Sequence, residues 1–210
     1  MKLLLVGASG LVGREVLRQA LDHPDVSRLI APTRRPLASA AGLDNPIIDF
    51  ERLPADASWW QVDAVICTLG TTMAQAGSRS AFRRVDHDYP LAVAGLARAA
   101  GASAFVLNSA LGAAADSRVF YNQVKGEVEN AIAALGYPSL TLVRPSLLDG
   151  GPRPDSRPGE RIALGIARIL RPLIPARYRA VATDAVARTL LAAALAQAPG
   201  VHILESERIA

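Results

Sequence analysis

Three residues in the second half of the chain have types and spacing suited to proton transfer. Tyr121 and Lys125 lie four positions apart, so on a helix their side chains share one face. A free phenol ionises only near pH ~10, but a neighbouring ammonium stabilises the phenolate and makes the group a general acid or base. Ser109 precedes Tyr121 by twelve positions and follows an apolar run, where its hydroxyl could polarise a substrate carbonyl. We interpret the three as a catalytic set. The alternative is a surface Tyr–Lys pair on an amphipathic helix.

Lysine is rare in this sequence, and its rarity supports a special role for Lys125. Among 23 basic residues only Lys2 and Lys125 are lysines. A lysine ammonium is a compact point charge, whereas arginine carries a planar fork. Lysine at position 125 therefore indicates that a compact cation is needed there, where it could bond the ribose hydroxyls of a dinucleotide.

The cofactor end of such a site is expected at the N-terminus. Leu3–Val6 is a continuous apolar run, typical of a strand buried on both faces of a parallel sheet. A glycine turn with the spacing G-x-x-G-x-x-G follows, and then an amphipathic helix over Leu11–His23. In that context backbone N–H groups can bind a pyrophosphate. The alternative is a turn that only lets the helix sit near the strand. The predicted contacts are Gly7, Ser9, Gly10, Leu11, Val12 and Gly13.

The three glycines have separate expected roles. Gly7 lets the chain leave the strand sharply, Gly10 lets the backbone approach a phosphate, and Gly13 lets the helix pack close to the sheet. The spacing differs from the G-x-G-x-x-G of the commonest dehydrogenases, so the strand and helix around it carry the interpretation.

Two arginines after the second predicted strand favour NADP(H) over NAD(H). The strand is expected over Val26–Ala31, and its end meets the adenosine ribose in dinucleotide folds. No acidic residue lies between Val26 and Ala41, and Arg34 and Arg35 follow the strand instead. A guanidinium suits a 2′-phosphate, which an acid would repel. The alternative is a solvated pair in an arginine-rich protein.

Further cofactor contacts are expected where later strands end. Asp49 ends a third strand predicted over Asn45–Phe50, and it could accept from the adenine amino group or equally from the backbone of the following turn. A fourth strand over Val62–Leu69 ends in small residues, and Cys67 within it is expected to be an inert core thiol. The remaining predicted contacts are Thr68, Leu69, Gly70, Lys125 and Arg144.

Strands and helices alternate along the whole chain, which predicts an α/β fold with a doubly wound parallel sheet and helices on both faces. We expect a single domain over 1–210 with a small C-terminal substrate-side region at about 146–182. The other expected elements are strands at Ala104–Leu107, Ser139–Val143 and Val201–Leu204, and helices at 78–101 (kinked at Pro90), 119–135, 157–170 and 183–197 (capped by Thr183).

Composition limits the function classes. The net charge of +4 comes without a basic run or interleaved aromatic residues, so we expect no nucleic-acid partner. Cys67 is the only cysteine, which excludes an intrachain disulfide and a thiolate metal cluster. No apolar run approaches the ~20 residues of a membrane span, and no signal-peptide pattern is seen. These features lead us to expect a cytoplasmic protein without membrane contact.

Several segments together resemble the atypical short-chain dehydrogenases/reductases, nearest the group of the human Tat-interacting protein. They are the glycine turn, Cys67–Thr72, Arg84–Tyr89, Tyr121–Glu129 and Arg157–Glu160. The resemblance covers essentially the whole chain. It implies an NADPH-binding Rossmann domain with Ser109, Tyr121 and Lys125 as the catalytic residues, and a homodimer formed through the helices at 89–100 and 119–135.

The sequence departs from the family pattern at positions that bear on function. Ala110 stands where a second serine is common, and Asp86 lies nearest to where classical members use an asparagine. We favour a reductase of a small carbonyl substrate. The alternative, motivated by these departures and by Asn108, is a regulatory NADP(H)-binding protein that acts on a protein partner. An epimerase or isomerase is a weaker third reading. Arg144, Arg157 and Arg161 could favour an anionic substrate.

Overall fold

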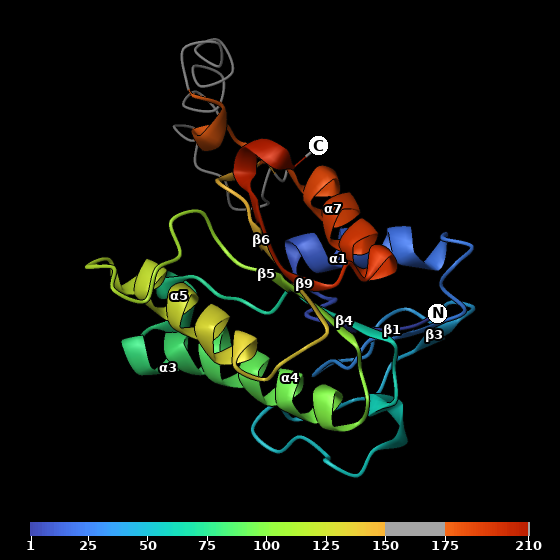
Figure 1. The fold of residues 1–210 in the computed structure, drawn as a ribbon. Helices are drawn as coiled ribbons and strands as arrows, with labels where there is room; N and C mark the ends of the chain where they lie inside the picture. Colours follow the sequence, from blue (N-terminus) through green and yellow to red (C-terminus); the bar gives the residue numbers. More distant parts are fainter. Residues whose placement is uncertain (150–174, 210) are drawn as a thin grey trace.

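A seven-stranded parallel sheet forms the centre of the fold in the computed structural model, which describes residues 1–149 and 175–209 (Figure 1). The strands lie in the order β3-β2-β1-β4-β5-β6-β9, and each pairs with its neighbours in parallel. Their bounds are β1 Lys2–Val6, β2 Arg28–Ile30, β3 Leu43–Asp44, β4 Ala64–Cys67, β5 Ala104–Asn108, β6 Ser139–Arg144 and β9 Gly200–Glu205.

Both faces of the central strands are buried, which explains why β1 reads as an unbroken apolar run. Leu3 and Leu5 belong to one hydrophobic core, and Leu4 and Val6 belong to the other. Successive side chains of a strand point to opposite faces. A strand with helices on both sides therefore needs apolar residues at every position.

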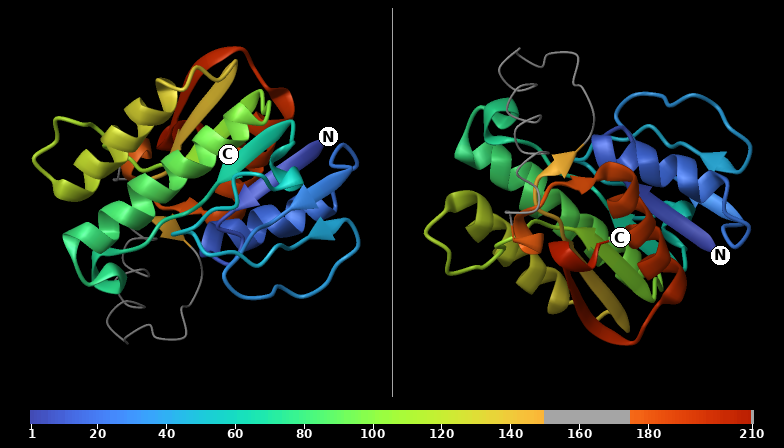
Figure 2. Two further views of the ribbon diagram at one scale, coloured as in Figure 1. Left: turned by 90° about the horizontal axis from the view of Figure 1, so that it is seen from below. Right: turned by 90° about the horizontal axis from the view of Figure 1, so that it is seen from above.

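The helices cover the sheet in two layers (Figures 1 and 2). On one side α1 (Leu11–Leu21) and α7 (Thr183–Ala196) contribute Val16 and Leu190 to the first core. On the other side α4 (Tyr89–Ala99) and α5 (Phe120–Ala133) contribute Val93 and Val128 to the second core. Shorter elements complete the described chain: α2 Met73–Ala76, α3 Arg79–Arg83, single 3-10 turns at Ser58–Trp60, Ala176–Tyr178 and Ser206–Arg208, and a small pair of strands, β7 Leu148–Asp149 and β8 Val181–Ala182.

The strand order changes direction between β1 and β4, because the chain runs outward through β2 and β3 and then returns to the other side of β1. In open α/β sheets the crevice beyond the carboxyl ends of the strands at this point is the usual place for a ligand. The predicted doubly wound Rossmann fold is therefore confirmed.

A widened turn interrupts the helix predicted over 78–101. The chain forms α3, one π-helical turn over Arg84–Asp88, and then α4. Pro90 lies in the first turn of α4 and has no N–H to donate back into the preceding turn. Such π-helical turns recur at functional sites, and this one carries Asp86.

The third strand differs from the expectation. We predicted a strand over Asn45–Phe50, but β3 is Leu43–Asp44, and within 45–50 only Ile47 forms an isolated bridge, to Thr33. The side chain of Asn45 bonds Ala31 O at 2.6 Å and accepts from Leu37 N at 2.8 Å. Pro46 has no N–H to add to a ladder, so these residues anchor a loop instead.

The predicted cap of α7 is also wrong. Ala182 occupies the N-cap position without a side-chain bond, and Thr183 is the first residue of the helix. The Thr183 hydroxyl donates to Asp149 O at 3.3 Å, which ties the helix to β7. The predicted helix over 157–170, Arg157, Arg161 and most of the substrate-side region at 146–182 lie outside the described residues.

Candidate functional site

The glycine turn after β1 is built on close backbone contacts. Gly7 has φ +95°, and a Cβ there would lie 2.6 Å from Thr68 Oγ1 and 2.8 Å from Leu69 N. A Cβ on Gly13 would lie 2.1 Å from Gly7 O. Only glycine fits at either position, so β1, α1 and the end of β4 can approach one another.

Gly10 is a different case, because the space above it is open. A Cβ there would meet Gly7 O at 3.3 Å and no other heavy atom within 4 Å. Gly10 is the N-cap of α1, and no side chain caps the helix. The N–H groups of the first helical turn, which begins with Leu11 and Val12, have no partner within the helix. Open space over uncapped N–H groups fits a phosphate of a dinucleotide.

The segment after β4 leads from the glycine turn toward Lys125. The Thr68 hydroxyl donates to Val6 O at 3.1 Å, so it braces the two strands. Leu69 packs against the second core, and Gly70 is exposed. A Cβ on Gly70 would lie 3.7 Å from Lys125 Nζ. Three consecutive residues thus connect the anion-binding turn with the predicted catalytic lysine.

Lys125 forms a buried ion pair with Asp86. Nζ lies 2.8 Å from Asp86 Oδ1, and the two side chains are 5% and 1% exposed. The other oxygen, Asp86 Oδ2, accepts from Thr71 N at 2.8 Å. Burial disfavours the ammonium, but the charges of Asp86 and Tyr121 outweigh it, so the pKa of Lys125 is raised and the side chain is cationic.

Tyr121 stands on the same face of α5, one turn before Lys125. Its ring packs on Phe82 of α3 with centroids 5.5 Å apart, and its hydroxyl makes no hydrogen bond with a described residue. Gly126 lets the loop after β5 press against this helix, because a Cβ there would lie 2.2 Å from Ala114 C. The phenol is therefore held by its ring, and its hydroxyl is free of hydrogen bonds to residues 1–149 and 175–209.

Ser109 is buried, and its hydroxyl is hydrogen-bonded to a carboxylate. Its hydroxyl donates to Glu129 Oε1 at 2.5 Å, and Glu129 is 3% exposed. Sequence reasoning missed Glu129. A signal was present, because Tyr121, Lys125 and Glu129 are spaced by four and form one line along α5.

Arg144 holds Glu129 in place. Its Nε lies 3.0 Å from Glu129 Oε1, its Nη2 lies 2.5 Å from Glu129 Oε2, and its Nη1 lies 2.9 Å from Glu205 Oε1. The hydrogen bonds to Glu129 and then to Glu205 raise the pKa of Arg144 further above its ordinary value. A cofactor contact by Arg144 remains a prediction, and it would have to share a guanidinium whose nitrogens all donate to carboxylates.

The residues predicted for the adenosine end lie on exposed or turn positions. Arg34 and Arg35 are exposed and form no ion pair with a described residue, and Thr33 Oγ1 fixes their loop by donating to Arg35 O at 2.6 Å. Asp49 Oδ1 accepts from Glu51 N at 3.0 Å, which is the turn contact named as one of its two alternatives. Ser9 is exposed within the glycine turn.

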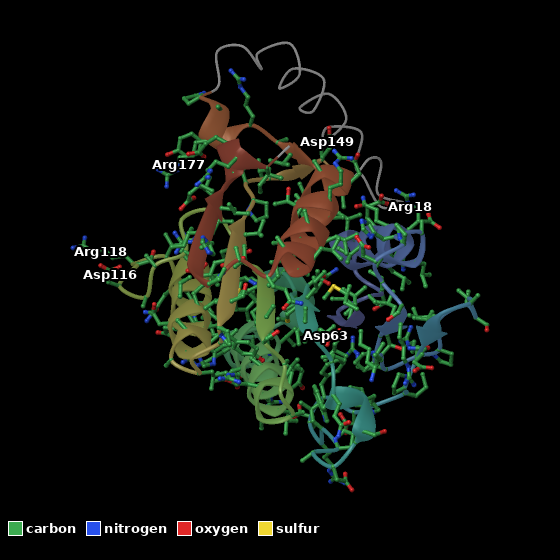
Figure 3. The ribbon with its side chains drawn as sticks, turned by 45° about the vertical axis from the view of Figure 1, so that its right-hand side comes forward. Arg18, Asp63, Asp116, Arg118, Asp149 and Arg177 are labelled. Carbon is green, nitrogen blue, oxygen red and sulfur yellow. The ribbon has the colours of Figure 1, made fainter. Side chains whose placement is uncertain are left out.

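A cavity of about 520 Å³ opens beside the first turns of α1, between that helix and the start of α7. Arg18 and Asp149, both in its wall, mark this flank of the molecule in Figure 3. Leu11, the first residue of α1, also lines it. Cys67 lies elsewhere, fully buried at the end of β4, and burial raises its pKa to about 11, in agreement with an inert thiol.

The fold and site define a Rossmann-type dinucleotide domain with the residue pattern of short-chain dehydrogenases/reductases. No family model matches the chain. It is 38% identical over 164 residues to rat HTATIP2, covering 76% of this chain and 67% of the relative. It is 34% identical over 169 residues to the protein fmp52, mitochondrial, of Emericella nidulans, covering 76% and 71%. The chain belongs to the atypical short-chain dehydrogenase/reductase family that includes HTATIP2 and Fmp52.

Solved structures support the same fold at lower identity. MoeE5 in complex with UDP-glucose and NAD has a TM-score of 0.72 at 18% identity, covering 97% of this chain and 75% of that one. Bordetella bronchiseptica WbmH in complex with NAD+ has a TM-score of 0.69 at 15% identity, covering 98% and 75%. At this identity the likeness concerns the fold alone.

The fungal relatives correct one expectation. Several of them carry the word mitochondrial in their names, which contradicts the predicted cytoplasmic location. That expectation is therefore wrong. Within residues 1–149 and 175–209, no helix has the length and apolar character needed to cross a membrane.

Proposed function

We propose that the protein binds NADP(H) and reduces a small carbonyl or related substrate. One observation carries the proposal: the uncapped N–H groups of α1 and the Tyr121–Lys125 face of α5 are joined by the short segment after β4. Gly7 contacts Thr68 at the start of that segment, and Gly70 approaches Lys125 at its other end. A dinucleotide could therefore span from the glycine turn to the phenol along the carboxyl edge of the sheet.

The residues at the reacting end divide the chemistry between them. Bound NADPH would supply a hydride. Lys125 would bond the ribose hydroxyls and stabilise the charge of a phenolate at Tyr121. Tyr121, whose hydroxyl is free among the described residues, would give its proton to the substrate oxygen.

Ser109 can take one of two parts in this proposal. Its single proton is directed at Glu129, so in the described arrangement its oxygen offers only lone pairs to a substrate or to Tyr121. To polarise a carbonyl as first expected, the hydroxyl would have to rotate away from Glu129.

The exposed pair Arg34 and Arg35 supports NADP(H) over NAD(H). Their loop follows β2, and no carboxylate pairs with either of them among the described residues. The 2′-phosphate of NADP(H) would supply the missing anion, and arginine matches phosphate geometry with two parallel N–H donors.

Turnover assays test the reductase proposal. NADPH oxidation is followed against aldehydes, ketones and quinones, with Tyr121→Phe as the diagnostic variant and Tyr89→Phe as the matched control on α4. Loss of a general acid should lower kcat by about 100-fold or more, while the control keeps its rate. Equal rates in the wild type and Tyr121→Phe would exclude the assigned acid.

A regulatory NADP(H)-binding protein is the second candidate, and a specific observation favours it. The two residues predicted to act with the phenol each bond a buried carboxylate, Lys125 that of Asp86 and Ser109 that of Glu129. Tight NADPH binding without turnover, together with a protein partner whose affinity changes with NADPH, would support this reading. Partner binding that ignores the cofactor would contradict it. The homodimer through α4 and α5 stays a prediction, tested by the mass of the protein in solution.

A further inference from the structure

The buried ion pair of Asp86 and Lys125 leaves its site with no net charge. The carboxylate comes from the π-helical turn and the ammonium from α5, and the two are 2.8 Å apart with almost no solvent exposure. Two other titratable groups act on this pair: the Cys67 thiol of β4 and the Tyr121 phenol of α5. Cys67 is neutral near neutral pH, because burial raises its pKa to about 11.

Asp86 is fixed on both of its oxygens. Oδ1 faces Lys125, and Oδ2 accepts from Thr71 N at 2.8 Å. Gly70 keeps this place open, because a Cβ there would lie 3.3 Å from Asp86 Oδ1. The carboxylate therefore lies directly under the exposed backbone after β4, where the reacting end of a dinucleotide is proposed to bind.

The two redox forms of a nicotinamide cofactor differ by one charge on the reacting ring. The oxidised ring is a cation, and the reduced ring is neutral. A lysine ammonium alone beside the ring would repel the oxidised form, and this repulsion is strong in a poorly solvated site. A carboxylate beside the lysine cancels it.

We propose that Asp86 is a specificity-determining residue that sets the relative affinity of the protein for NADP+ and NADPH by cancelling the charge of Lys125. The inference rests on the proposed cofactor site, but it does not depend on turnover. It therefore applies to the reductase and to the regulatory protein alike.

The test is the ratio of the dissociation constants of NADP+ and NADPH. NADPH binding is measured by its fluorescence, and NADP+ binding by competition, at several pH values between about 5 and 8, because an ammonium that is buried without a partner holds its proton less tightly. Asp86→Asn removes one charge and keeps the side-chain shape. It should raise the ratio about tenfold, the order expected for one unit charge across a side chain. Asp88→Asn, an exposed change on the same turn, is the matched control and should leave the ratio within about twofold.

A second variant should shift the ratio of the two dissociation constants in the opposite direction. Lys125→Met leaves the carboxylate without its cation, and wherever that carboxylate is ionised it attracts the oxidised ring. This variant should weaken both cofactor forms through the lost ribose contact but lower the ratio. It also tests the inference if Asp86→Asn does not fold.

The outcomes separate the inference from the function on which it rests. If the wild type binds neither form, the proposed cofactor site is wrong. If the wild type binds both and Asp86→Asn weakens both equally, Asp86 has only a structural role and the inference is overturned. A shift of the ratio in the same direction for Asp86→Asn and Lys125→Met would overturn it as well.

Discussion

Replacing Gly10 and Gly13 by alanine should separate cofactor binding from folding, although the two glycines lie in one turn. In Gly13→Ala the new methyl group would start 2.1 Å from Gly7 O and 2.7 Å from Gly7 C. Both atoms are backbone, so α1 must move away from β1. Overpacking of this kind costs about 1–3 kcal/mol and sometimes more, and we expect the upper end of that range.

Gly10→Ala should leave the fold almost unchanged. The methyl group would lie 3.3 Å from Gly7 O, and the backbone angles of Gly10, φ −76° and ψ 172°, are open to alanine. Gly10 is the N-cap of α1, and at that position alanine makes a helix less stable than glycine by about 1 kcal/mol or less. The same methyl group fills the open space over the first-turn N–H groups. Loss of one charge-assisted hydrogen bond to a phosphate would weaken NADPH binding about 10- to 100-fold.

Urea unfolding and NADPH titration of the two variants measure the two effects. Gly95→Ala is the matched control, because Gly95 lies inside α4 with no heavy atom within 4 Å of its Cβ position. It should stabilise the protein by about 0.5–1 kcal/mol and leave binding unchanged. Wild-type affinity for NADPH in Gly10→Ala, or wild-type stability in Gly13→Ala, would refute the assignment of roles within the turn.

Three further predictions concern the arginines after β2, the buried thiol and the ion pairs of Arg144. Arg34→Asp and Arg35→Asp should each weaken the binding of NADPH about tenfold and leave the binding of NADH nearly unchanged. An equal loss of affinity for NADPH and NADH would contradict recognition of the 2′-phosphate. Cys67 is buried and its pKa is raised to about 11, so it should react far more slowly with a thiol reagent in the native protein than after unfolding in urea, at about pH 7 and at about pH 9 alike, whereas equal rates in the native and unfolded protein would contradict the buried thiol. Arg144→Met leaves Glu129 and Glu205 without their cation and should destabilise the protein by about 3–5 kcal/mol; adding Glu129→Gln should recover part of that loss in urea unfolding, and a fully additive loss would contradict the pairing.

The parts of the fold that were predicted correctly have local causes. β1 is an unbroken apolar run that ends in a glycine turn, and both features lie within thirteen consecutive residues. The alternation of strands and helices then fixes a parallel sheet, because parallel neighbours need a crossover between them. The error at β3 has a local cause as well. Asn45 and Pro46 favour a loop over a ladder, and the apolar Ile47 and Ile48 outweighed them in the prediction.

The predicted site residues are brought to one edge of the sheet, but their partners come from distant parts of the chain. Arg144 of β6 donates to Glu129 of α5 and to Glu205 of β9, and β6 and β9 are neighbours only through the strand order of the sheet. No periodicity in the sequence links these three residues. A buried ionic network of this kind therefore cannot be predicted from one sequence.

The contact between Asp86 and Lys125 could not be predicted from the sequence either, and it changes how a Tyr–Lys motif should be interpreted. The four-residue spacing correctly places Tyr121 and Lys125 on one face of a helix, and it invites the conclusion that the phenol sits beside an unbalanced cation. The direction of Asp86 depends on a π-helical turn, whose extra residue rotates every later side chain relative to an ordinary helix. Asp86 Oδ1 lies 2.8 Å from Lys125 Nζ, so the ammonium one turn after Tyr121 is paired with a carboxylate from another element. A Tyr–Lys motif therefore has to be interpreted together with the residue that pairs with its lysine, here Asp86.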